Sequence, residues 1–196
     1  MSTIDREKWD ERYRSGAYEG RTHPTELLAE WLPRLPRGRA LDVACGIGRN
    51  ALYLSGQGYT VDAVDISSVA LERARESARE RRLAINWIEA DLESKQLPDE
   101  RYDLIVIVRY THAALLPHLI ERLAPGGHLL CEEHLQTHRE VVGPTNARFR
   151  MRPNELLTVA KRGLRILYYR EGLIDDPDGR TAALAQLVGC VGSPGF

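Results

Sequence analysis

The chain has 196 residues, of which 43% are hydrophobic and 28% charged, as is ordinary for a soluble globular protein. Its formal net charge of −1 at pH 7 provides no overall positive field to recruit nucleic acid or an anionic membrane. The longest apolar run in the middle of the chain, 104–108, is too short to cross a bilayer. Three widely spaced cysteines, Cys45, Cys131 and Cys190, favour a reducing compartment over a disulfide framework or a zinc site.

These properties predict one domain over residues 1–196, in the cytoplasm, with no metal. The N-terminal residues 1–13 are charged and contain no apolar stretch of the signal-peptide type. We expect a monomer or a homodimer, acting on a small molecule and not on nucleic acid or a membrane.

Helical and extended patterns alternate along the chain. Two helices are predicted first, at 3–14 and 25–32, the second with Thr25 as its cap and Pro33 after its end. Extended segments separated by helical patterns of about 10–15 residues are typical of strands joined by right-handed crossovers in a parallel sheet. The predicted strands are 39–44, 59–64, 84–89, 102–109 and 128–134, and the predicted helices between them are 48–57, 67–82 and 113–123.

The end of the chain has a different pattern. A helix at 154–161 precedes two extended segments, 164–172 and 181–191, joined by a turn-rich loop at 175–179. They are predicted to pair antiparallel and to close the sheet edge. The fold class is therefore α/β, a three-layer, doubly wound, Rossmann-like sheet of seven mostly parallel strands with a C-terminal antiparallel hairpin. The polar segment 136–152 is expected at the edge where such sheets bind ligands.

Residues 40–50 contain the most informative motif, Ala-Leu-Asp-Val-Ala-Cys-Gly-Ile-Gly-Arg-Asn. A glycine turn between a strand and a helix lets backbone N–H groups approach a ligand closely. One interpretation is a dinucleotide site, because Gly46, Gly48 and Ala51 fit the G-x-G-x-x-G/A fingerprint and Asp65 ends the next strand. A nicotinamide-dependent oxidoreductase is the corresponding alternative function.

Asp42 argues against a pyrophosphate ligand, because a buried carboxylate would face it with like charge. S-adenosylmethionine fits better, since its α-amino group is cationic and it carries no phosphate. Asp65 would then accept hydrogen bonds from two ribose hydroxyls, and Asp91 from the exocyclic amine of adenine.

These motifs resemble class I S-adenosylmethionine-dependent methyltransferases, and they follow the expected order across 38–135. Two further phrases, 48–54 and 9–13, are similar to the tellurite-resistance methyltransferase group. One departure is Ala44, which stands where this family has a glycine and for which a positive φ is costly. The phrases that carry the family resemblance are 41–48, 64–67, 90–92, 102–105 and 123–127.

The resemblance implies a methyltransferase fold with residues 1–35 as a lid, 38–135 as the cofactor-binding core and 136–196 as substrate loop and hairpin. The cofactor would be S-adenosyl-L-methionine, with S-adenosyl-L-homocysteine as product. The implied cofactor-binding residues are Trp9, Tyr13, Asp42, Ala44, Cys45, Gly46, Gly48, Asn50, Asp65, Ile66, Asp91, Leu92 and Arg109.

Several of these residues have structural alternatives. Asp42 could cap a nearby loop, and Cys45 is expected to be a small buried filler because no basic residue adjoins it. Trp9 and Tyr13 could pack their helix onto the domain, and Arg109 could be a structural ion-pair partner.

Methyl transfer from a sulfonium is an in-line displacement that depends mainly on alignment and exclusion of water. The candidate catalytic residues are Arg109, Tyr110, His112 and His134, with Glu132 and Glu133 also near the ligand edge. A non-catalytic cofactor-binding protein of the same fold remains an alternative. A basic excess in the substrate-facing segments suits a small anionic acceptor, and comprises Arg14, Arg109, His112, His134, His138, Arg139, Arg148 and Arg150.

Overall fold

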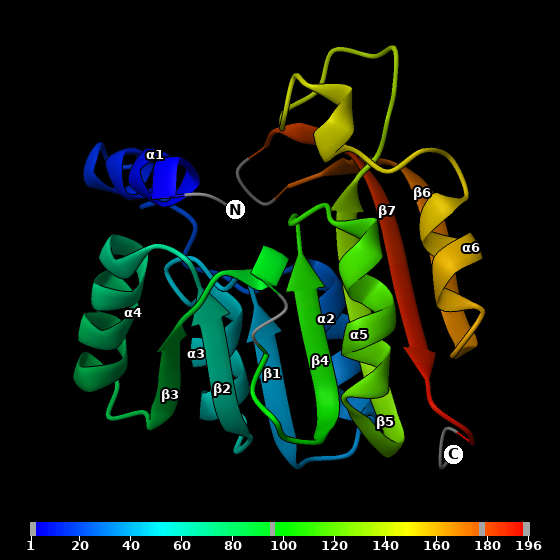
Figure 1. The fold of residues 1–196 in the computed structure, drawn as a ribbon, viewed down its shortest axis with the longest axis horizontal. Coiled ribbons are helices and arrows are strands. Elements are labelled where there is room, and N and C mark those ends of the chain that lie inside the picture. Colours follow the sequence, from blue (N-terminus) through cyan, green and yellow to red (C-terminus); the bar gives the residue numbers. More distant parts are fainter. Residues whose placement is uncertain (1–2, 95–96, 177–178, 194–196) are drawn as a thin grey trace.

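A computed structural model of the chain describes residues 3–94, 97–176 and 179–193 (Figure 1). Its strands are β1 Arg39–Val43, β2 Thr60–Asp65, β3 Ile85–Glu89, β4 Tyr102–Val108, β5 Leu123–His134, β6 Arg165–Asp175 and β7 Thr181–Cys190. They form one sheet of order β3-β2-β1-β4-β5-β7-β6. The first five strands are parallel, and β7 runs antiparallel to both β5 and β6. The predicted fold class is confirmed. Within the predicted turn at 175–179, residues 177 and 178 lie outside the described part of the chain.

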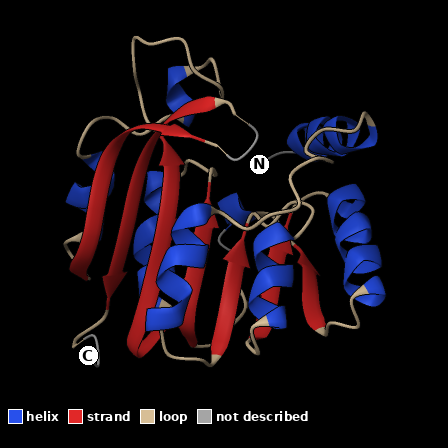
Figure 2. Ribbon diagram, turned by 180° about the vertical axis from the view of Figure 1, so that it is seen from behind, coloured by secondary structure: helices blue, strands red, loops and turns tan. Residues whose placement is uncertain are grey.

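Helices cover both faces of this sheet (Figure 2). The helices are α1 Thr3–Arg14, α2 Glu26–Trp31, α3 Arg49–Gly56, α4 Ser68–Glu80, α5 Leu116–Glu121 and α6 Glu155–Ala160. Apolar side chains of α2, α3 and α4 pack in one core cluster with Ala40, Val61 and Leu104 of the sheet. Those of α5 and α6 pack on the opposite face with Leu41 and Ile105. Adjacent residues of one strand thus enter different cores, as the alternation of side chains along a strand requires.

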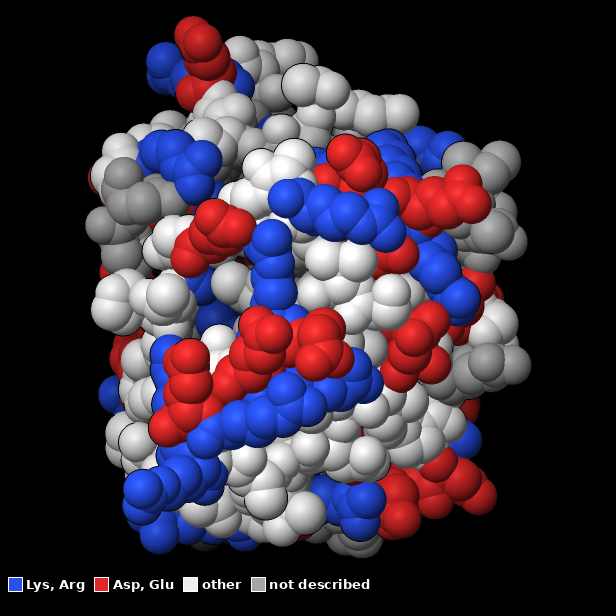
Figure 3. All heavy atoms as spheres, turned by 90° about the vertical axis from the view of Figure 1, so that its left-hand side faces the viewer, with Lys and Arg blue, Asp and Glu red and all other residues white. Residues whose placement is uncertain are grey.

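Helix α4 shows how the sequence sets an element. The side chain of Ser67 accepts a hydrogen bond from the Ala70 N–H and caps the helix. Apolar residues at helical spacing, with Leu71 among them, are buried, and the outer face carries both charge signs interspersed (Figure 3). Glu72 pairs there with Arg75 at 3.4 Å and with Arg79 at 3.6 Å. The helix is therefore held by one apolar face, and its charges are solvated.

Two elements differ from the prediction around the segment 123–127. The predicted helix 113–123 begins with a 3-10 turn, Ala113–Leu115, and α5 ends at Glu121. Strand β5 starts at Leu123, earlier than the predicted 128, and its register with β4 shifts between Tyr102 and Leu104. An added Cβ on Gly127 would lie 2.6 Å from the Tyr102 carbonyl oxygen, so the strands approach too closely there for a side chain. The Pro-Gly-Gly sequence is thus an irregular beginning of the strand, not a loop.

The carboxyl ends of β1, β2, β4 and β5 meet at one edge of the sheet, where α1 and the segment 136–152 also lie (Figure 1). That segment contains a 3-10 turn, Ala147–Phe149, and is tied to the sheet by an isolated bridge between Leu135 and Met151. None of the helices in the described residues has the length and apolar character that a membrane crossing needs. Those residues also contain no group of three or more His, Cys, Asp or Glu side chains arranged to hold a metal.

Candidate active site

The glycine turn after β1 has an unusual backbone. Ala44, Gly46 and Gly48 have φ angles of +54°, +55° and +78°. The Cys45 N–H donates to the Val64 carbonyl at 3.0 Å, which ties the turn to β2. Ala44 therefore adopts the left-handed conformation that glycine would adopt without strain, so the departure from the family pattern changed the residue and not the shape of the turn.

Asp42 lies at the base of this turn and is 1% exposed. Its Oδ2 accepts a hydrogen bond from the Ala51 N–H at 2.9 Å, so the carboxylate caps the first turn of α3. Burial raises the pKa of Asp42 to about 7, against the opposing effects of the Ala51 N–H and the Arg49 charge. Asp42 thus caps a helix and not the loop expected as the alternative. With a pKa near neutral pH, the ionisation of Asp42 responds to any charge placed beside it.

Asp65 and Asp91 end the next two strand segments at the same edge. Both carboxylate oxygens of the buried Asp65 accept backbone N–H groups, from Gly46 at 2.7 Å and from Ser67 at 2.9 Å. Burial raises the pKa of Asp65, and these hydrogen bonds oppose that shift. Asp91 is half-buried and accepts from the Glu93 N–H at 2.9 Å. Each of the three predicted carboxylates is thus fixed by backbone N–H groups, those of Asp42 and Asp65 at the glycine turn and that of Asp91 in its own turn after β3.

Helix α1 is docked onto the glycine turn through Tyr13. Tyr13 is buried, and an added Cβ on Gly46 would lie 2.7 Å from its hydroxyl oxygen. Burial and the neighbouring Asp65 raise the pKa of Tyr13, so its hydroxyl is protonated at neutral pH. The ring of Trp9, which is half-buried, lies 6.1 Å from that of Tyr13. Asp10 fixes the helix further by accepting from the Ser67 hydroxyl at 2.6 Å.

The remaining implied cofactor residues have packing or capping contacts. Ile66 and Leu92 are buried at the strand ends, and the buried Cys45 has a pKa raised well above its usual value by burial and by Asp65 and Asp42. Cys45 is thus a small filler and not a nucleophile. Gly48 is required by packing, because an added Cβ would lie 2.5 Å from the Trp87 ring.

Asn50 contacts a neighbouring helix. Its buried side-chain oxygen accepts from the Thr25 N–H at 3.0 Å, immediately before α2. Thr25 in turn donates through its hydroxyl to Glu132 at 2.9 Å. Asn50 and Thr25 therefore join α3, α2 and β5, and the cofactor contact expected for Asn50 stays a prediction.

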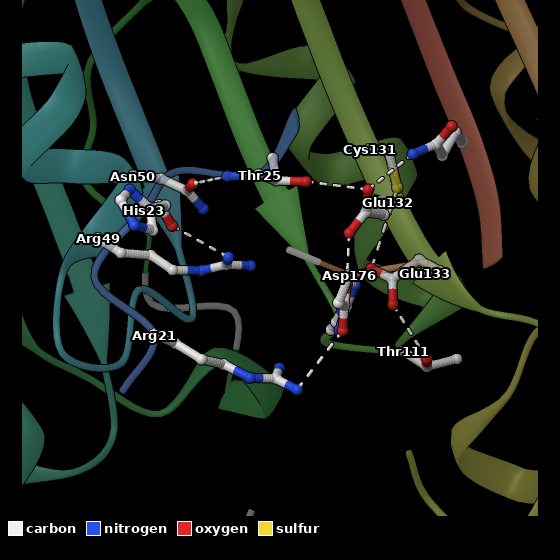
Figure 4. Close-up of polar contacts among 12 residues, drawn as sticks. Arg21, His23, Thr25, Arg49, Asn50, Thr111, Cys131, Glu132, Glu133 and Asp176 are labelled. Atoms are coloured by element: carbon white, nitrogen blue, oxygen red, sulfur yellow. Dashed lines mark hydrogen bonds and ion pairs between the residues drawn. The ribbon is translucent and has the colours of Figure 1, made fainter. Parts of the chain in front are cut away.

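A cluster of charged side chains lies at the carboxyl ends of β4 and β5 (Figure 4). Arg109, with φ +59°, donates through Nε to Glu132 at 3.2 Å and through its terminal nitrogens to both carboxylate oxygens of Asp176. Asp176 also pairs with Arg21 at 3.6 Å. All four side chains of this ion-pair cluster are at most 20% exposed. Arg109 is thus a structural ion-pair partner in this structure, and a contact with the sulfonium stays a prediction.

The candidate catalytic side chains at this edge differ in environment. Burial and the charges of Arg109, Arg150 and Arg21 lower the pKa of His134 to about 3. His134 is therefore neutral at pH 7 and a weak base, so this environment does not support the expected general-base role. His112 is half-buried at the start of the turn 113–115.

Burial favours the protonated forms of both Tyr110 and Glu133. The buried Tyr110 hydroxyl has no hydrogen-bond partner among the described residues, and burial raises its pKa. Glu133 is 0% exposed and accepts from the Thr111 hydroxyl at 2.9 Å. Burial raises the pKa of Glu133 to about 8.

The basic residues expected to gather here do so only in part. Arg109 and His134 lie in or beside the ion-pair cluster, whereas His138, Arg139 and Arg148 are exposed. Arg14 pairs with Glu11 at the surface at 3.4 Å. Arg150 donates to three carbonyl oxygens of its own segment, those of Leu135, Val142 and Pro144. The physical reason is that a long irregular loop needs donors for its own carbonyl groups.

Sequence reasoning missed Arg21, Arg49, Thr25 and Asp176. Arg49 follows Gly48 directly and reaches from the start of α3 toward Asp176 (Figure 4). It donates to the His23 carbonyl at 3.2 Å. Its position in the motif Gly-Arg-Asn was the available signal, but no spacing rule connects it to Arg21 or to a turn aspartate.

The strand order and the acid-containing glycine turn define a Rossmann-like methyltransferase fold. Residues 40–127 match the family model described as "Methyltransferase domain". The ubiquinone biosynthesis O-methyltransferase of Rickettsia akari is 26% identical over 107 residues, 52% of this chain and 42% of that protein. The chain spans about half the length of the curated relatives it matches.

Two solved structures share the fold. TehB from Haemophilus influenzae has a TM-score of 0.74 and 24% identity, covering 93% of this chain and 67% of that one. Magnesium protoporphyrin IX methyltransferase (ChlM) from Synechocystis PCC 6803, with bound S-adenosylmethionine (SAM), has a TM-score of 0.67 and 18% identity, covering 94% and 95%. Residues 40–127, less than half of the chain, thus match a methyltransferase domain, and the fold is the Rossmann-like methyltransferase fold that the motifs predicted.

Proposed function

We propose that this chain transfers the methyl group of S-adenosylmethionine to a small anionic molecule. The observation that carries the cofactor part is the buried Asp42 at the base of the glycine turn. An ammonium group beside Asp42 would favour the charged form of a carboxyl whose pKa is about 7, whereas a pyrophosphate would oppose it. In this proposal Asp65 would accept from the ribose hydroxyls and Asp91 from the adenine amine, and Tyr13 and Trp9 would cover the methionine end.

The anionic acceptor is supported by the charges at the ends of β4 and β5. Arg49 and Arg109 line one cavity with Asp176, and both Arg21 and Arg109 pair with Asp176. Burial and the positive charges of Arg109 and Arg21 lower the pKa of Arg49. His134 is neutral and can donate a hydrogen bond without adding charge. An acceptor that arrives as an anion needs no base, so alignment and exclusion of water by the N-terminal helix would be sufficient.

Calorimetry with S-adenosylhomocysteine and with NADH tests the cofactor. We expect binding of the former only, weakened about tenfold or more in Asp42→Asn, because the amide keeps the cap but loses the charge. Binding of NADH alone, or unchanged affinity in Asp42→Asn, would contradict the role of Asp42. A panel of carboxylate, thiol and oxyanion acceptors with methyl-labelled SAM then tests turnover. Binding without any methylated product would favour the non-catalytic alternative.

A further inference from the structure

Arg49 differs from the other two arginines near the ligand edge in having no acidic partner. Arg109 and Arg21 share the carboxylate of Asp176, and Arg109 also pairs with Glu132. Among the residues that the structure describes, no carboxylate pairs with Arg49, and its one hydrogen bond goes to the neutral carbonyl of His23. Arg49 is thus a half-buried guanidinium with five N–H donors and no carboxylate among its partners in the described residues.

The surroundings of Arg49 disfavour its charged form. Burial is the largest cause of the lowered pKa of Arg49, and the charge of Arg109 is the next. Removing a cation from water costs free energy that only a nearby anion recovers. Asp42 and Glu132 oppose the shift, but their carboxylates are already engaged with Ala51, and with Thr25 and Gln186 respectively.

Space for a small polar group adjoins this guanidinium. A cavity of about 20 Å³ is lined by Arg49 and Arg109 together with Glu132 and Asp176. That volume accommodates one water-sized group, such as a single oxygen atom of a ligand. Glu26 and Asp175 line the same cavity, but both are exposed, and Asp175 accepts from the Thr181 hydroxyl.

We propose that Arg49, supported by Arg21 and Arg109, is the binding group for a carboxylate or similar oxyanion of a ligand in this site. Guanidinium groups bind such anions through paired N–H donors. The oxyanion of the ligand would be the acidic partner that Arg49 lacks. Two ligands carry such an oxyanion: the cofactor, through its methionine carboxylate, and an anionic methyl acceptor. The inference rests on the proposed function, because it assumes that the cofactor occupies the neighbouring glycine turn.

The test compares Arg49→Gln and Arg49→Lys with Arg79→Gln, which removes the same charge from the exposed outer face of α4. Thermal unfolding first verifies that all variants fold. Three probes are then titrated into the full chain: S-adenosylhomocysteine, its decarboxylated analogue S-adenosyl-3-thiopropylamine, and acetate or inorganic phosphate in the presence of saturating S-adenosylhomocysteine. Failure of wild type to bind either adenosyl probe refutes the proposed function and not this inference alone.

Two results support the inference and identify the source of the anion. If the cofactor supplies it, Arg49→Gln weakens S-adenosylhomocysteine at least tenfold and leaves the decarboxylated analogue unchanged, with Arg49→Lys intermediate. If an acceptor supplies it, both adenosyl probes bind normally, and the stabilisation of wild type by acetate or phosphate is lost in Arg49→Gln. If the Arg49 variants match Arg79→Gln with every probe, the inference is overturned.

Discussion

At the scale of single residues, the glycine turn contains an alanine in a conformation that favours glycine. Ala44 has a φ of +54° and is held there by a turn that β2 and Asp65 both fix. A left-handed conformation costs an L-residue roughly 1 kcal/mol relative to glycine. The chain therefore tolerates local strain beside its proposed cofactor site, where such strain commonly accumulates.

Replacing Ala44 with glycine is expected to raise the free energy of unfolding by about 0.5–1 kcal/mol, because glycine adopts this φ without the Cβ clash. Urea denaturation followed by circular dichroism measures the change. The matched control is Ala78→Gly, in the buried face of α4, which should lower stability by about 1 kcal/mol. If both variants lose stability equally, Ala44 is not strained.

At the scale of elements, the segment 136–152 shows how a largely irregular loop is ordered with one 3-10 turn and isolated bridges. Its polar composition predicted a functional loop but not a conformation. The structure shows that Arg150 holds it, with Nε donating to the Pro144 carbonyl at 2.7 Å and a terminal nitrogen to that of Leu135 at 3.0 Å. Such contacts between a side chain and distant carbonyl groups leave no periodic signal in a sequence.

Arg150→Met is expected to loosen this segment while the sheet stays intact. Amide hydrogen exchange in 137–149 should become at least tenfold faster, because three carbonyl groups lose their donor. Global unfolding should change by no more than about 1 kcal/mol, since the segment contributes little apolar burial. Arg148→Met is the control, as that exposed arginine only stacks on Phe149. Equal protection in both variants would refute the role of Arg150.

At the scale of the whole molecule, the elements that follow a clear period could be predicted, and those that depend on distant partners could not. The alternation of apolar strands and amphipathic helices predicted the seven-stranded sheet and the edge at which the carboxylates meet. The early start of β5 depends on the close approach of Gly127 to the Tyr102 carbonyl, which no local pattern reports.

The candidate site also has a part that the sequence predicts and a part that it does not. Asp42, Asp65 and Asp91 lie at or within two residues of the carboxyl ends of β1, β2 and β3, so the topology places them at one edge of the sheet. The ion pairs of Arg109 with Asp176 and of Asp176 with Arg21 join residues that are remote in sequence. Residue type and charge do not identify which of the 27 lysines and arginines pair with Asp176. The ion-pair cluster is therefore evident only from the structure.

The stability of the whole molecule is also expected to depend on pH through His128. This residue lies on β5 opposite Leu104 and Cys190, is 0% exposed, and neither ring nitrogen has a partner among the described residues. Burial lowers the pKa of His128 below its usual value of 6.5. The unfolded chain therefore takes up a proton near pH 6.5 that the folded chain does not, and stability falls as the pH drops below that value.

His128→Leu should remove this effect, because leucine fills the space without polar atoms or a titratable proton. We expect the variant to be more stable than wild type by about 1 kcal/mol at pH 7.5, since two unpaired buried nitrogens are removed, and by more at pH 5. Urea denaturation at both pH values measures the difference, in which other titrating groups cancel. His118→Leu on α5, whose side chain is 38% exposed, is the control for replacing a histidine outside the core. Parallel curves for His128→Leu and wild type would mean that His128 is paired in solution, for example by a buried water.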